Sequence, residues 1–106
     1  MKIEFRAVRK RIELADYAPE LAHGHIDVQV NVSREQMKRM LNVSAETPDD
    51  EFYGLLQELW GAESWPLEDL QALRNHCAEN DPQLWRWITR RTWDLVMEHQ
   101  GMIKKK

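Results

Sequence analysis

The sequence contains a single cysteine, Cys77, among 106 residues, so no internal disulfide can form and no CxxC metal knuckle exists. Its four glycines form neither a phosphate-binding loop followed by lysine nor a GxSxG nucleophile motif. No apolar run approaches the roughly 20 residues of a membrane span, and charged residues interrupt the N-terminus where a signal peptide has an apolar block. We therefore expect a cytoplasmic protein in a reducing compartment, without membrane contact.

The residues that are present indicate a folded chain with a well-solvated surface. Hydrophobic residues make up 42% of the chain and include five tryptophans, while 31% of the residues are charged. This length suffices for one modest core. We predict a single small domain over residues 1–106, with a strand-rich part at 1–32, a helical part at 33–101 and a basic tail at 102–106.

The first third of the chain shows the two-residue period of β-strands. Apolar and polar residues alternate from Ile26 to Val32, which is typical of a strand with one buried and one wet face. Upstream, the apolar parity changes near Ala7, so we expect one or two strands over residues 3–14, with a bulge or break at that point. The connecting segment should be an ordered loop with Tyr17 and Leu21 turned inward.

Helical start and stop signals follow. Ser33 and Gln36 form a capping-box pattern at the start of a short first helix. A second helix should begin with Thr47 as its N-cap and Pro48 as its first residue. This helix should end at Gly61.

Two further helices complete the predicted fold. Ser64 should open the third helix, with Pro66 early in its first turn and an end near Asn80. Asp81 and Pro82 then repeat the cap-plus-proline pattern, and the last helix should run to about residue 101. The predicted class is therefore α+β: short N-terminal antiparallel strands followed by about four helices, predominantly helical.

The last helix carries three tryptophans that one core-facing stripe cannot accommodate. Counting 100° per residue places these residues on the core side: Leu84, Trp85, Ile88, Thr92, Leu95, Val96 and His99. Trp87 falls on the border of this stripe, and Trp93 lies diametrically opposite. The side chains that share the second face with Trp93 are Met97, Arg86 and Arg90.

Three interpretations of the second face remain open. It can be a protein interface formed by Trp93, Met97, Arg86, Arg90 and Trp87, because Trp, Met and Arg are enriched at binding surfaces. Alternatively, the N-terminal sheet or the tail "GMIKKK" covers Trp93 within the fold. In the third interpretation, nucleic-acid bases stack on Trp93, which the negative total charge disfavours.

Charge is strongly segregated along the chain. The net charges of residues 1–14, 15–40, 41–81 and 82–106 are +3, −1, −9 and +4, and the whole chain carries −3. The ends can fold back on the acidic middle, or the molecule can present two faces of opposite sign to partners. Asp49, Asp50 and Glu51 form an acidic face at the start of the second helix, where the helix dipole favours them.

Candidate catalytic groups are few. His23 and His25 flank a glycine, but no third metal ligand is fixed by spacing. His76 is adjacent to Cys77, and adjacent helical residues point about 100° apart, which is unsuited to a nucleophile and its base. We therefore expect no enzymatic activity, no metal and no cofactor.

The order of the segments resembles the tail assembly chaperones of long-tailed, siphovirus-type bacteriophages and prophages. The residues that carry this resemblance are "KRIELADYAPEL", "HIDVQVNVSREQMKRML", an acidic helix ending in "ELWG", then "WPLEDLQAL" and "DPQLWRWITRRTWDLV". A strand-rich beginning with a "DY.PE" loop and a "V.VNPS"-like step into a tryptophan-rich helical half is typical of that family. Ser33 stands where the family often has proline.

The resemblance implies a function in virion assembly. Such a protein binds the long helical tape-measure protein, keeps it soluble, helps to recruit tail-tube subunits and is absent from the finished particle. It also implies self-association into an oligomer.

Two rival functions remain open. A small acidic inhibitor or regulatory protein would bind a host enzyme through residues 46–69 and would lose its activity when Asp49, Asp50 and Glu51 are neutralised. A small DNA-binding regulator would use Arg86, Arg90, Arg91 and the terminal lysines, and its retention on DNA would fall steeply with salt.

Overall fold

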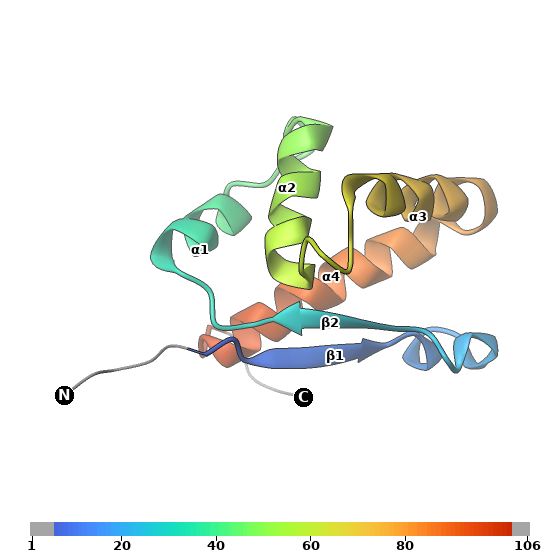
Figure 1. Cartoon of the computed structure of the whole chain (residues 1–106), viewed down its shortest axis with the longest axis horizontal. Coiled ribbons are helices and arrows are strands. Elements are labelled where there is room, and N and C mark those ends of the chain that lie inside the picture. Colours follow the sequence, from blue (N-terminus) through green and yellow to red (C-terminus); the bar gives the residue numbers. More distant parts are fainter. Residues whose placement is uncertain (1–5, 103–106) are drawn as a thin grey trace.

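A computed structural model describes residues 6–102 of the chain. Two strands, β1 (Arg9–Glu13) and β2 (His25–Gln29), are joined by two short 3₁₀ helices, η1 (Leu14–Asp16) and η2 (Pro19–Leu21). Four helices follow: α1 (Arg34–Leu41), α2 (Asp49–Trp60), α3 (Leu67–Asn80) and α4 (Pro82–His99). The α+β class with predominant helix is therefore confirmed (Figure 1).

The sheet is a two-stranded antiparallel pair with one buried face. Ile12 is paired with Ile26, and both are almost fully buried. β2 is shorter than the predicted strand 26–32, yet the Val30 amide still donates to the Val8 carbonyl at 2.8 Å. Residues 6–8 precede β1, and residues 3–5, on the other side of the predicted bulge or break near Ala7, lie outside the described residues, so this break stays a prediction.

The connection between the strands is ordered. Tyr17 and Leu21 are half-buried, as predicted for inward-facing loop residues. Gly24 lies against Leu14, and a Cβ at position 24 would meet the Leu14 Cδ1 at 2.6 Å. A close approach of this kind requires glycine or a shift of the leucine side chain.

The helix ends follow the predicted signals with two exceptions. The capping box of Ser33 and Gln36 is present, and the Asp81 carboxylate accepts from the Gln83 amide at the start of α4. Pro48 and Pro66, however, are N-caps rather than first-turn residues. Their φ angles of −58° and −55° suit a helix, but their ψ angles of 144° and 155° are extended. The predictions that Thr47 caps α2 and that Ser64 opens α3 are therefore wrong.

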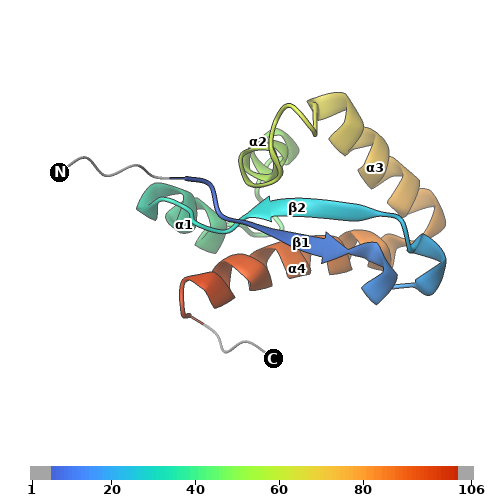
Figure 2. The same ribbon diagram turned by 60° about the horizontal axis from the view of Figure 1, so that its bottom comes forward.

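Helix α4 is the central element of the core. It runs along the sheet and packs against α3, and α1, α2 and α3 follow one another from left to right above the sheet in Figure 1. Figure 2 shows α4 on the side of the sheet away from α2 and α3. The buried core comprises Ile12, Ile26, Val28, Val30, Met40, Tyr53, Leu55, Leu56, Leu59, Trp60, Leu70, Ile88, Leu95, Val96 and Met97. His99, predicted to face the core, is exposed in the last turn of α4. Within residues 6–102, no helix is long and apolar enough to cross a membrane.

Candidate functional site

Trp93, the centre of the predicted second face, is covered within the fold. Its indole Nε1 donates to the Met40 carbonyl at the end of α1 at 3.1 Å. Its ring stacks on Phe52 of α2, with centroids 5.9 Å apart and planes inclined by 23°. Helices α1 and α2 therefore cover Trp93, and neither the sheet nor residues 100–102 supply the stacking ring or the hydrogen-bond acceptor.

The other predicted interface residues separate into two groups. Met97 is only 9% exposed and belongs to the core, and Trp87 packs against Tyr17 with ring centroids 5.4 Å apart. Arg86 and Arg90 are exposed on one narrow side of α4. A continuous exposed face of tryptophan, methionine and arginine is therefore absent from α4 as described, because neighbouring elements cover its apolar members.

The Tyr17 hydroxyl joins the inter-strand connection to the start of α4. It donates to the Asp81 Oδ2 at 2.7 Å, and this hydrogen bond to a carboxylate raises the pKa of Tyr17 above its ordinary value. Asp81 therefore has two structural contacts, because its Oδ1 also accepts from the first turn of α4. The hydrogen bond to Asp81 fixes Tyr17, and Trp87 packs against this tyrosine.

The remaining rings of α4 also find partners inside the molecule. Trp85 meets Phe52 and Trp60 edge-on, with centroids 6.4 Å apart in each case. The Trp60 indole N–H donates to the Thr92 hydroxyl at 3.1 Å, and both residues are fully buried. One helix therefore accommodates three tryptophans because elements on several sides surround it.

The facing sides of α1 and α2 leave a groove of about 420 Å³ at the surface. Its lining comes from the end of α1, the connecting loop and the first two turns of α2. The lining residues are Arg39, Asn42, Val43, Thr47, Glu51, Gly54 and Leu55. The lining combines two apolar side chains, Val43 and Leu55, with four polar or charged ones. Sequence reasoning missed this groove, since it depends on how α1 is placed against α2.

Gly54 lies in the middle of α2 and forms part of the groove. A Cβ at this position would meet no heavy atom within 4 Å, and its φ is not positive. Glycine inside a helix lowers the stability of the protein by roughly 0.5–1 kcal/mol relative to alanine. Neither packing nor backbone conformation within the described residues requires glycine here. The open space above the α2 backbone therefore suits close approach by another molecule.

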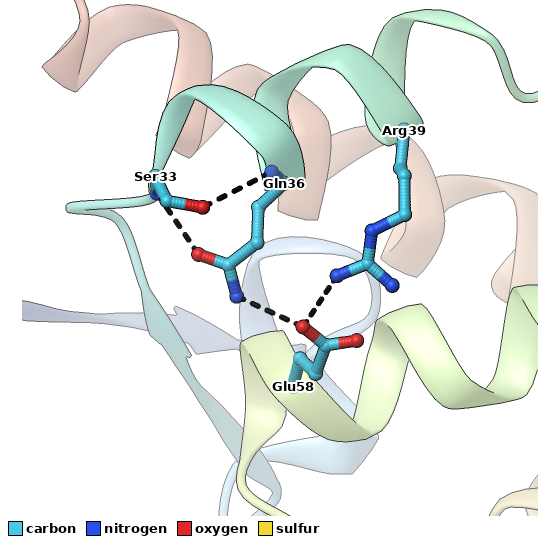
Figure 3. A network of polar contacts seen from close by, with 4 residues as sticks. All are labelled: Ser33, Gln36, Arg39 and Glu58. Atoms are coloured by element: carbon cyan, nitrogen blue, oxygen red, sulfur yellow. Dashed lines mark hydrogen bonds and ion pairs between the residues drawn. The ribbon is translucent and has the colours of Figure 1, made fainter.

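A polar network fixes the α1 wall of the groove against α2 (Figure 3). The Gln36 side chain accepts from the Ser33 amide at 2.9 Å and donates to the Glu58 Oε1 at 3.1 Å. The same carboxylate oxygen accepts from the Arg39 guanidinium. One glutamate of α2 therefore holds both the first turn and the last turn of α1.

The ion pair shifts the titration of both its members. The hydrogen bond from Arg39 lowers the pKa of Glu58 below its ordinary value, while desolvation partly opposes this shift. The pKa of Arg39 is raised, first by the hydrogen bond to Glu58. Both side chains are more than 40% exposed, so water screens the pair and its energetic contribution is small.

The predicted acidic face borders the groove. Asp49, Asp50 and Glu51 are all exposed at the start of α2, and Glu51 lines the groove itself. Asp49 forms an ion pair with Arg74 of α3 at 3.0 Å, and Arg74 also donates to the Tyr53 hydroxyl. Asp50 and Glu51 form no ion pair within residues 6–102. Their charges are therefore available to a partner at the rim.

The weaker catalytic candidates are not brought together. His23 and His25 are exposed at the start of β2, and residues 6–102 contain no group of three metal-binding side chains. Cys77 is buried, and burial raises the pKa of its thiol, which disfavours the reactive thiolate. The neighbouring His76 is exposed and contacts Asn80 instead.

Comparisons of the chain with protein-family models, with curated proteins and with solved structures give no match.

Proposed function

We propose that this chain is a non-enzymatic phage tail assembly chaperone-like protein that acts in the host cytoplasm. It binds the tape-measure protein and tail-tube subunits during virion assembly. The order of sequence segments described above supports this proposal, and the surface between α1 and α2 is compatible with it. A chaperone of this kind requires a binding surface on a soluble, highly charged domain, without catalytic groups.

The observation that carries the proposal is the groove over Gly54. Amphipathic helices are recognised when their apolar side chains enter a groove between elements of the partner. Val43 and Leu55 supply apolar walls, Gly54 allows close approach, and Glu51 at the rim suits a helix that also carries basic residues. A largely helical tape-measure protein offers segments of this type.

The proposal is tested with the tagged full-length chain as bait. The lysate comes from its source host, after induction of any resident prophage, and retained proteins are identified by mass spectrometry. Wild-type protein should retain a very long helical phage protein or a tail-tube subunit. A Cβ at position 54 would meet no heavy atom within 4 Å, so Gly54→Leu should place its side chain in the groove and abolish this retention.

Two controls separate the groove from general surface effects. Ala78→Leu adds the same side chain at an exposed position of α3 and should leave retention unchanged. Gly54→Ala should raise the free energy of unfolding by about 0.5–1 kcal/mol, because alanine favours the helix and meets open space. If a Gly54 variant is more stable than wild-type protein and yet retains less of the partner, its loss of binding is not caused by unfolding.

Other results would overturn the proposal. Retention of a single host enzyme that is lost on neutralising Asp49, Asp50 and Glu51 would indicate the inhibitor function instead. Retention on DNA that falls steeply with salt and requires Arg86 and Arg90 would indicate the DNA-binding regulator. Equal retention by wild-type protein and Gly54→Leu would remove the groove from the function.

A further inference from the structure

Within residues 6–102, β1 pairs only with β2, and its outer edge has no neighbouring strand. Hydrogen bonds from the Val30 amide to the Val8 carbonyl and from the Leu14 amide to the Gly24 carbonyl mark both ends of the ladder. In an antiparallel pair such bonds recur at every second residue, so even-numbered residues of β1 face β2. The amides and carbonyls of Arg9, Arg11 and Glu13 therefore point away from the sheet.

The Asn31 side chain prolongs this edge toward the N-terminus. Its Oδ1 accepts from the Val8 amide at 2.8 Å, and its Nδ2 donates to the Arg6 carbonyl at 2.7 Å. Residues 6–8 are thereby held in line with β1 by a side chain that replaces a neighbouring strand. At about 3.4 Å per residue, the edge from Ala7 to Glu13 is roughly 20 Å long, which suits a strand of about seven residues.

The side chains along this edge are basic. Residues 6–13 contain Arg6, Arg9, Lys10 and Arg11 against one acid, Glu13, and all five are exposed. Asp27 forms an ion pair with Arg11 at 3.2 Å. Within residues 6–102, Arg6, Arg9 and Lys10 form no ion pair. Positive charge and unpaired backbone groups therefore coincide on one edge.

We propose that the β1 edge binds an extended acidic segment of a partner protein, which adds a third strand to the sheet. Backbone hydrogen bonds to Arg9, Arg11 and Glu13 hold the segment, and its carboxylates face the basic side chains. The β1 edge lies on the side of the sheet away from α1 and α2 (Figure 1), whereas the groove is lined by residues of α1, α2 and the loop between them. Binding at the edge is independent of the proposed function of the groove.

The edge discriminates against other occupants. Nucleic-acid phosphates accept hydrogen bonds but cannot donate to the outward carbonyls, whereas a peptide strand offers a donor and an acceptor at each alternate residue. A second copy pairing through β1 would bring two net-positive strands together, and like charges on facing strands are destabilising. Charged side chains on an edge commonly prevent such self-pairing. An acidic extended segment offers both backbone donors and acceptors, and its charge is opposite to that of the edge.

The test uses the full-length protein and a labelled, capped eight-residue peptide that alternates threonine with glutamate. Binding is followed by fluorescence polarisation, and hydrogen exchange is followed for each amide by NMR. The amides of Arg9, Arg11 and Glu13 should exchange rapidly in the free protein and slowly in the complex. The amides of Lys10 and Ile12 face β2 and should be protected in both states.

Variants and a modified peptide separate backbone pairing from charge attraction. Arg9→Pro removes an outward amide, which an edge strand tolerates, and should weaken binding by about tenfold or more. Arg9→Gln removes only the charge and should have a smaller effect, while the matched change Arg90→Gln on α4 should have none. A peptide N-methylated at two adjacent central residues has one blocked amide on each of its edges. This peptide should bind wild-type protein at least about tenfold more weakly.

Four results would overturn the proposal. The first is equal binding of the N-methylated peptide, which would reduce the interaction to charge attraction. The second is single-stranded DNA binding that protects the same amides as well as the acidic peptide does. The third is a concentration-dependent dimer in which β1 amides become protected without peptide. Absence of peptide binding at low salt is the fourth, and it applies to folded wild-type protein regardless of how the variants behave.

Discussion

The aromatic side chains of α4 are covered by neighbouring elements, whereas the facing sides of α1 and α2 leave an open groove. On α4, Trp85, Trp87 and Trp93 each have an aromatic neighbour from another element. Between α1 and α2, the surface over Gly54 is left open. The large aromatic residues of α4 are therefore explained by packing, whereas Gly54 has no packing role among the described residues.

The two regions are nevertheless coupled. Trp93 holds the end of α1 through the Met40 carbonyl, and its ring lies on Phe52 of α2. The helices that form the groove are thus positioned by a side chain of the core helix. Changes on α4 should therefore act mainly on stability, whereas changes in the groove should act mainly on binding.

The largest expected effect belongs to Trp93→Ala. Removal of this half-buried ring eliminates the stack on Phe52 and the indole hydrogen bond to the Met40 carbonyl, which then keeps the longer bond from the Val43 amide at 3.3 Å. We expect the free energy of unfolding, measured by urea denaturation, to fall by about 2–4 kcal/mol. Trp93→Phe keeps a ring for the stack and should lose roughly half as much.

This variant also decides between the interpretations of the second face. If Trp93→Ala unfolds at the same urea concentration as wild-type protein, the ring contributes little to stability and an interface role is restored. If stability falls as expected, the loss of partner binding by this variant carries no information about an interface. The Gly54 variants then provide the cleaner measurement.

Much of the secondary structure was predictable because its signals are local. The alternation around β2, the capping box at Ser33 and the Asp81–Pro82 start of α4 depend on residues within one or two turns of each other. Pro48 and Pro66 were misplaced because proline fixes φ but not ψ. Both a helical first residue and an extended cap satisfy that restriction.

The candidate site was not predictable in the same way. A helical wheel gives the direction of Trp93 around α4 but not which element lies in that direction. The cover comes from α1 and Phe52, more than 40 residues earlier in the chain. The groove has the same origin, because it exists only where α1 meets α2. Its one local sign was a glycine inside a predicted helix.

An intermediate effect is expected for the buried hydroxyl between α2 and α4. Thr92→Val leaves the Trp60 indole N–H without an acceptor in a fully buried position. The cost should be about 1–3 kcal/mol in the free energy of unfolding. Thr92→Ser retains the hydroxyl and loses one methyl group, so it serves as the matched control. A valine variant at least as stable as the serine variant would contradict the role assigned to this hydrogen bond.

The smallest effect concerns the ion pair that holds the wall of the groove. Because the pKa of Glu58 is lowered in the folded state, its stabilising contribution is complete above the ordinary value of 4.5. The contribution is lost as the pH falls through the lowered pKa. Glu58→Gln should therefore cost about 0.5 kcal/mol or less at pH 7, and its deficit should vanish in acid as wild-type Glu58 becomes protonated.

Urea denaturation of both proteins between pH 7 and pH 2.5 measures this difference, and added salt should reduce it at neutral pH. A deficit that persists unchanged in acid would show that the carboxylate charge is not its cause. The same variant sharpens the comparison between the two regions. Glu58 holds Gln36 and Arg39 of α1, so its neutralisation loosens one wall of the groove while the tryptophans of α4 keep their contacts. Glu58→Gln should therefore reduce partner retention while it lowers the free energy of unfolding only slightly. For Trp93→Ala the main effect should instead be on the free energy of unfolding.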